Sequence, residues 1–140
     1  MAQQLSIFLE NAPGRLAALS RALGEGGFNM YALSLADTSD YGVARIFVDR
    51  PASAKDYLEQ QGFSGTLTEV CAVEIPDEPG SLGRLLELLS DNEVNIAYSY
   101  VFVNPLTKQA INVFKLSDPG AVALLEQEGY RVLDDGALHA

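Results

Sequence analysis

The stretch that decides the fold is NAPGRLAALSRALGEGGFNM, residues 11–30, because it recurs 66 positions later as DEPGSLGRLLELLSDNEVNI, residues 77–96. Six residues are identical between the two copies: Pro13, Gly14, Leu16, Leu19, Leu23 and Asn29 match Pro79, Gly80, Leu82, Leu85, Leu89 and Asn95. Self-similarity at a fixed period is typical of tandem copies of one structural unit. We therefore expect two domains, residues 1–69 and 70–140.

The repeat continues beyond residue 30 if one residue is inserted in the second copy, which changes the shift to 67. Phe47 then matches Phe114, residues 58–60 match residues 125–127, and Gly62 matches Gly129. Glycine takes the left-handed conformation that ends many helices, so Gly62 and Gly129 indicate helix ends.

Each copy shows the same series of apolar patterns. Alternation at residues 5–9 and 71–75 predicts a strand with one buried face. Spacings of three and four at residues 16–23 and 82–89 predict amphipathic helices. In the first copy the expected helices are 15–25 and 54–61. In the second copy they are one that starts after Pro79-Gly80 and ends near residues 91–92, and 121–128. The expected strand pairs are 30–36 with 43–48 in the first copy and 96–103 with 110–116 in the second. Hairpin signals lie at residues 38–42 and 104–105, and a short strand closes each copy.

This order, βαββαβ in each copy, predicts an α+β fold. It is the order of the ferredoxin-like split βαβ arrangement, in which two helices cover one face of an antiparallel four-stranded sheet.

Composition excludes several classes of partner. A net charge of −10 opposes binding to nucleic acid and to anionic membranes, which are also negatively charged. No apolar run approaches the roughly 20 residues that span a bilayer, and residues 1–20 lack a secretory pattern. We expect a cytoplasmic protein. The single Cys71 lies in an apolar run and is expected to be buried, and the single His139 is expected to lie in a frayed tail.

The Pro-Gly corner between the first strand and first helix is the strongest local motif, at residues 11–16 and 77–82. Free backbone N–H groups and the positive end of the helix dipole meet there, and glycine lets a carboxylate approach the main chain. Asp77 or the side-chain oxygens of Asn11, Asn29 and Asn95 would accept hydrogen bonds from an ammonium group. One corner would then hold both ends of an amino acid.

Structural explanations of the same residues remain open at this stage. Proline in a first helical turn and Asn or Asp just before it are ordinary capping choices, and Asn29 and Asn95 would simply fix turns. Arg15 and Arg84 either contact an anion or are solvated. Five aromatic residues would either line a pocket or belong to the core and the sheet surface: Tyr31, Tyr41, Tyr98, Tyr100 and Phe102.

No catalytic or metal-binding pattern is found in the sequence. It has no paired Cys or His at metal-ligand spacing, no phosphate loop and no Ser/His/Asp set. We expect no enzyme activity, no metal and no cofactor. Seven acidic residues are expected to be exposed, and their number does not indicate a catalytic pair of carboxylates: Glu25, Asp40, Glu59, Glu69, Glu87, Asp91 and Glu126.

The βαββαβ order, the Pro-Gly-x-Leu helix start and the Asn before the second strand resemble an ACT domain in each half. The whole chain resembles small stand-alone bacterial proteins of two ACT modules without an attached enzyme. The resemblance implies a regulatory protein that senses a free amino acid at the interface between modules, forms a homodimer and acts on an enzyme or other protein partner. The ligand-facing positions that it implies are Asn11, Pro13, Gly14, Arg15, Leu16, Asn29 and Met30, and Asp77, Pro79, Gly80, Ser81, Leu82, Asn95 and Ile96. The copies differ at Asn11 against Asp77 and at Arg15 against Ser81, so the two corners are not expected to be equivalent.

Two other functions remain open. A docking or oligomerisation module without a small ligand would use the same fold. A ferredoxin-like acyl-phosphate hydrolase would use Arg15 at an anion-binding helix start, although the second copy lacks that arginine.

Overall fold

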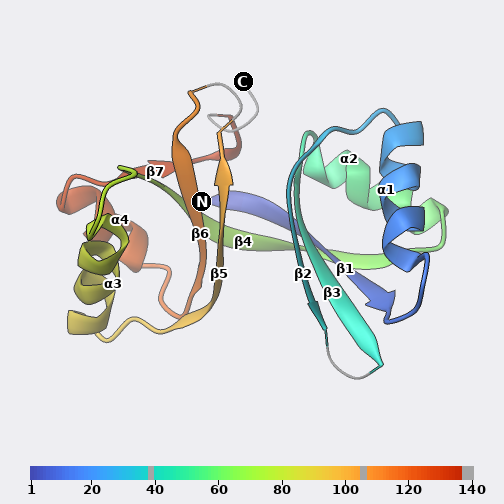
Figure 1. Cartoon of the computed structure of the whole chain (residues 1–140). Coiled ribbons are helices and arrows are strands. Elements are labelled where there is room, and N and C mark those ends of the chain that lie inside the picture. The colour runs from blue at the N-terminus through green and yellow to red at the C-terminus, as the bar shows by residue number, and fades with distance from the viewer. Residues whose placement is uncertain (38–39, 105–106, 137–140) are drawn as a thin grey trace. The chain divides into compact units, whose positions relative to one another are not determined.

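A computed structural model shows that the chain has an α+β fold made of two compact units. The structure describes residues 1–37, 40–104 and 107–136. The first unit, here the N-unit, is Gln3–Thr68, and the second, the C-unit, is Glu69–Ala140 together with Met1–Ala2. Each unit has the predicted βαββαβ order (Figure 1). The long strand β4, Ser64–Ile75, is the last strand of the N-unit and the first of the C-unit.

The helices and strands follow the predicted pattern closely. The N-unit elements are β1 (Ala2–Glu10), α1 (Arg15–Glu25), β2 (Met30–Asp37), β3 (Tyr41–Val48) and α2 (Pro51–Gln60). The C-unit elements are α3 (Ser81–Asp91), β5 (Ile96–Val103), β6 (Ala110–Leu116), α4 (Ala121–Gln127) and β7 (Arg131–Leu133).

The start of α2 differs from the prediction. The helix begins at Pro51, three residues before the expected residue 54. Proline presets the helical φ and lacks only an N–H that a first turn does not use, so it suits this position. Gly62 and Gly129 both have left-handed φ, +91° and +88°, as predicted for helix ends. The predicted turn residues 38, 39 and 105, and His139, lie outside the described residues.

Both helices of the N-unit cover the same face of its sheet. The strand order is β2-β3-β1-β4, with antiparallel pairing of β1 to β3 and of β2 to β3. Leu5, Ile7 and Leu9 of β1 point inward, as their alternation predicts. The core is completed by residues from β3 and both helices: Ala44, Ile46, Val48, Leu19, Ala22, Leu23, Ala54 and Leu58.

The C-unit repeats this arrangement in the order β7-β4-β6-β5. Cys71, Val73 and Ile75 of β4 take the inward positions of the first strand. The helices contribute Leu85, Leu89, Ala121 and Leu125 to the same core, beside Phe114 and Val94. Burial raises the pKa of the Cys71 thiol to about 11.

The predicted match of Phe47 to Phe114 is wrong by one residue. Phe114 pairs with Cys71, whereas the equivalent pair in the N-unit is Ile46 with Leu5. Phe114 therefore takes the place of Ile46, and the strand needs two inserted residues instead of one. A one-residue error matters because it turns a side chain to the opposite face of the sheet.

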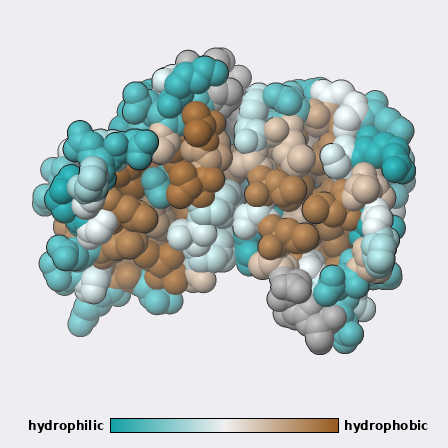
Figure 2. All heavy atoms as spheres, viewed as in Figure 1, coloured by the Kyte–Doolittle hydropathy of each residue, from teal (hydrophilic) through white to brown (hydrophobic). Residues whose placement is uncertain are grey.

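The surface agrees with the charge pattern. The seven acidic residues that were expected to be exposed are all exposed. Hydrophilic side chains cover much of the visible surface, with hydrophobic ones gathered between them on both units (Figure 2). Among the described residues, no helix has both the length and the apolar character needed to cross a membrane.

Candidate functional site

The corner between β1 and α1 is a tight turn built on Gly14. Its φ of +85° lies in the left-handed region, where a side chain would be strained. The Ala12 amide donates to the Glu10 carbonyl at 2.9 Å, and the Arg15 amide donates to the Ala12 carbonyl at 3.4 Å. These bonds turn the chain directly from the strand into the helix.

The corner between β4 and α3 has the same construction. Gly80 has φ +87°, the Glu78 amide donates to the Pro76 carbonyl at 3.0 Å, and the Ser81 amide donates to the Glu78 carbonyl at 3.2 Å. The two Pro-Gly motifs therefore produce the same backbone geometry in both units.

Neither helix start is closed by a side-chain cap. Within the described residues, nothing accepts a hydrogen bond from the amides of Leu16 and Ala17, or from those of Leu82 and Gly83. The first N–H groups of a helix have no partner inside it and carry a partial positive charge. Each corner thus presents two adjacent amide donors, and the capping role considered for Asn11 and Asp77 is not used.

A cavity lies against each corner, and the two are lined by equivalent positions of the two units. Both combine the end of the first strand, the corner, the first helical turn and residues from the next two strands, with Asn112 as an additional lining residue of the C-unit cavity. The lining pairs are Leu9 and Ile75, Glu10 and Pro76, Asn11 and Asp77, Ala12 and Glu78, Arg15 and Ser81, Leu16 and Leu82, Leu35 and Val101, and Gly42 and Ala110. The repeated sequence therefore builds a repeated concavity.

The predicted corner residues differ in how far they are buried. Ser81 is only 4% exposed, whereas Arg15 and Leu16 are half-buried. The exposed members are Asn11, Pro13, Gly14, Asp77, Pro79, Gly80 and Leu82. None of the five aromatic residues considered for a pocket lines either corner cavity among the described residues.

The cavities also differ in size and charge. The N-unit cavity measures about 60 Å³ and the C-unit cavity about 200 Å³. Arg15 extends over the Phe63 ring, 5.6 Å from its centre, and its Nε is shielded from solvent without a partner among the described residues. In the smaller cavity the helix start is thus occupied by an arginine and the half-buried Leu16.

Arg84 supplies a positive charge to the C-unit corner, where Ser81 stands in place of Arg15. Its guanidinium donates to the Ser81 hydroxyl at 3.3 Å. A Cβ added to Gly80 would lie 3.2 Å from the same guanidinium. Arg84 therefore lies one turn further along α3 than Ser81, and its guanidinium reaches back over the helix start. A comparison of residue 15 with residue 81 alone does not reveal this positive charge.

Asn112 is a site residue that the sequence analysis missed. It lines the C-unit cavity and is 7% exposed. Its only sequence signal is a polar residue inside an otherwise apolar strand, AINVFKL. The strand is apolar on both faces, so alternation does not indicate which face this residue occupies.

Asn29 and Asn95 do not join the corners of their own units. Met30 pairs with Val48, six strand positions from Gly42 at the corner, and this separates them by about 20 Å. The Asn29 amide donates to Asp49 Oδ1 and the Asn95 amide donates to the Ser117 hydroxyl, both at 2.9 Å. Within one unit, each of these asparagines therefore lies away from the corner, and their role in ligand binding stays a prediction.

Asn95 and Ile96 instead line a separate cavity of about 440 Å³. Its other lining residues come from α3 and the turn after it: Leu86, Leu89, Ser90, Glu93 and Val94. Asn29 is exposed and Met30 packs against the N-unit core.

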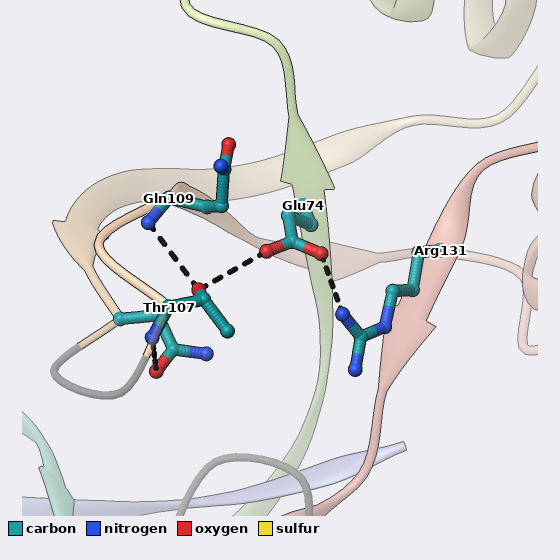
Figure 3. Close-up of polar contacts among 5 residues, drawn as sticks. Glu74, Thr107, Gln109 and Arg131 are labelled. Atoms are coloured by element: carbon teal, nitrogen blue, oxygen red, sulfur yellow. Dashed lines mark hydrogen bonds and ion pairs between the residues drawn. The ribbon is translucent and has the colours of Figure 1, made fainter.

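A larger cavity of about 590 Å³ lies beside β4 and β7. Glu74 is its central polar residue (Figure 3). One of its oxygens accepts from the Thr107 hydroxyl at 3.3 Å and the other from Arg131 at 3.0 Å. Both carboxylate oxygens of Glu74 therefore already have partners, while Gln109, Glu128 and Tyr130 also line this cavity.

Comparison with known proteins agrees with this architecture. A protein-family profile described as "ACT domain pair" matches residues 1–130. No curated protein matches the sequence significantly.

Solved structures share the fold over nearly the whole chain. Protein BT0572 from Bacteroides thetaiotaomicron is 33% identical with a TM-score of 0.90, and the match covers 99% of this chain and 95% of that one. The regulatory subunit of aspartate kinase from Thermus thermophilus, in a ligand-free form, is 16% identical with a TM-score of 0.66 over 89% of this chain and 88% of that one. The regulatory subunit of aspartate kinase from Thermus flavus is 18% identical with a TM-score of 0.63 and the same coverage.

Proposed function

Because the chain belongs to the ACT domain pair family, we propose that it is a regulatory protein that binds a free amino acid at a helix-start corner. The observation that carries this proposal is the repeated pair of unpartnered amides beside a cavity, at Leu16 and Ala17 and at Leu82 and Gly83. A site for a small anion needs such donors, because backbone N–H groups bind carboxylates without a charged side chain.

The C-unit corner has complementary groups for both ends of an amino acid. The α-carboxylate would accept from the amides of Leu82 and Gly83, with the Arg84 guanidinium nearby. The α-ammonium would donate to the carboxylates of Asp77 or Glu78, which line the same cavity. Opposite charges at two sides of a small cavity favour a zwitterion over a simple anion or cation.

In this proposal the chain transmits the binding event and performs no chemistry on the ligand. Bound amino acid stabilises the conformations in which the corner is well formed, by at most the difference between its affinities for the alternative conformations. A protein partner that recognises one of these conformations then responds to the concentration of the amino acid. Aspartate kinase regulatory subunits have the same fold, which supports an enzyme as the regulated partner.

We also propose that the protein forms homodimers through its edge strands. Among the described strands, β2 pairs with β3 alone and β5 pairs with β6 alone. Both carry exposed apolar side chains: Leu33, Leu35, Val101 and Val103. An unpaired strand edge with apolar side chains favours pairing with another chain. Sedimentation should give a dimer that Leu33→Lys or Val103→Lys weakens, and a monomeric wild-type protein would contradict this part.

A thermal-shift panel against the twenty amino acids tests the proposed function. A ligand at a hundredfold its Kd stabilises the folded state by about 2.7 kcal/mol, which should raise the Tm by roughly 5 to 10 °C for a chain of this size. Gly80→Val should remove the shift because its side chain would enter the corner. Gly129→Val is the matched control, since Gly129 has a similar φ of +88° and lies outside both corners.

Two results bear on the proposal. A shift with one or a few amino acids that Gly129→Val retains and Gly80→Val loses supports it. A Tm that none of the twenty amino acids raises would overturn it and would favour a docking module without a small ligand.

A further inference from the structure

The Asn112 side chain lines the C-unit cavity, and its amide atoms keep some contact with solvent: among the described residues, the one fully shielded side-chain nitrogen or oxygen without a partner is Arg15 Nε. The residue is 7% exposed, and its side chain makes no hydrogen bond with any described residue. It pairs with Val73 of β4 and Val101 of β5, so it faces the helix-covered side of the sheet. Its two cross-strand neighbours, Val73 and Val101, are apolar and offer it no hydrogen bond.

Side-chain amides of nearly buried residues nearly always have a hydrogen-bond partner, either a protein group or an ordered water. Ala44 occupies the equivalent position in the N-unit, because Ala44 pairs with Ile7 as Asn112 pairs with Val73. The fold therefore does not require an amide at this position. The asparagine lines the cavity, and this points to a partner that enters from the corner.

We infer that the C-unit corner is the only one of the two that binds the amino acid, and that Asn112 selects a ligand with a short, hydrogen-bonding side chain. This inference rests on the proposed function and adds the site, the stoichiometry and the class of ligand. Candidate ligands are serine, threonine and asparagine.

The sizes of the two cavities support a single site. The N-unit cavity, about 60 Å³, has less than a third of the volume of the C-unit cavity, about 200 Å³. A small amino acid of about seven to nine heavy atoms matches the second volume, with part of the ligand at the open mouth.

The positions of the polar groups fix the orientation of the ligand. The amides at the start of α3 would bind the α-carboxylate, and the Arg84 guanidinium lies beside them at Ser81 and Gly80 without lining the cavity. Asp77 and Glu78, which are exposed and line the cavity, would bind the ammonium. The ligand side chain then extends inward between Ile75 and Val101. At the inner end it meets Asn112, whose amide both donates and accepts.

Isothermal titration with isosteric pairs of amino acids tests this assignment. The probes are threonine against valine, asparagine against leucine and serine against alanine, each titrated into the wild-type full chain. At least one polar member should bind with a stoichiometry near one per chain and at least tenfold more tightly than its apolar partner.

Two variants locate the source of the preference. Asn112→Ala should fold, because alanine occupies the same position in the N-unit, and it should lower the polar ligand's affinity about tenfold while leaving that of the apolar partner nearly unchanged. Lys115→Ala, on the same strand but facing the other side of the sheet, should keep the wild-type preference.

Three results would overturn the inference while leaving the proposed function intact. They are two ligands per chain, a preference for the apolar members, or a polar preference that survives in Asn112→Ala. Binding of none of the twenty amino acids would overturn the proposed function itself.

Discussion

Asn112 and Ala44 occupy the same position in the two units, each paired with the middle inward residue of its unit's first strand, Val73 and Ile7 respectively. One unit thus has a methyl group where the other has an amide, on otherwise equivalent scaffolds. Because a methyl group suits the core position in the N-unit, the amide is explained better by ligand binding than by folding.

Exchange of these two residues should have unequal effects on stability without ligand. Ala44→Asn places an unsatisfied amide in a packed core and should destabilise the protein by about 1–3 kcal/mol. Asn112→Ala removes an amide that borders a cavity and should change the stability little. Denaturant unfolding of both variants measures the difference. A loss above about 2 kcal/mol in Asn112→Ala would show that the amide stabilises the free protein.

Arg84 should contribute to ligand affinity through the carboxylate. Its guanidinium donates to Ser81 at the start of α3, and hydrogen bonds between ionised groups contribute about 1.5–3 kcal/mol. Arg84→Ala should therefore weaken amino-acid binding by roughly tenfold or more in calorimetric titration. Arg21→Ala, which removes an exposed arginine of α1, is the control for net charge. An equal loss in both variants would exclude a local role for Arg84.

Gly65 should be intolerant of any side chain, for steric reasons. A Cβ at this position would lie 2.4 Å from Ile7 Cδ1 and 2.7 Å from the Ser6 carbonyl oxygen. Gly65→Ala should destabilise the protein by about 1–3 kcal/mol because it forces backbone and side chain apart. Gly24→Ala in α1 meets nothing within 4 Å and should stabilise by about 0.5–1 kcal/mol. Thermal unfolding that ranked the two variants in the reverse order would contradict this packing.

Cys71 should make stability fall at alkaline pH. Burial raises its pKa from an ordinary 9.0 to about 11, so between these values the folded state keeps a proton that the unfolded state loses. Its contribution is therefore complete below pH 9 and declines by about 2–3 kcal/mol as the pH rises to 11. Denaturant unfolding at pH 8 and pH 10.5 measures the decline, which should be smaller in Cys71→Ala. An equal decline in both proteins would show that other groups cause it.

The sequence was sufficient to predict the fold class and most element bounds. Helix 15–25 and strands 96–103 and 110–116 were predicted at their observed limits, because strong periodicity and flanking glycine, asparagine or proline define them. The start of α2 was missed because residues 51–53 lack an apolar spacing, and Pro51 was not used as a helix start.

The candidate site was only partly predictable. The Pro-Gly motifs indicated both corners, since glycine at positive φ and a helix start are local properties of the chain. The sizes of the cavities depend on side chains from β2, β3, β5 and β6, which no local pattern brings together. The role of Asn112 depends on the strand register, and the alignment that matched Phe114 to Phe47 put it on the wrong face.

The most direct test of the account is a ¹H–¹⁵N NMR titration of the full chain with the amino acid that gives the largest thermal shift. The account predicts the largest chemical-shift changes at the backbone amides of Leu82 and Gly83 and at the Asn112 side-chain NH₂, with small changes at Leu16 and Ala17. Equal changes at both corners, or changes confined to residues away from α3, would contradict it.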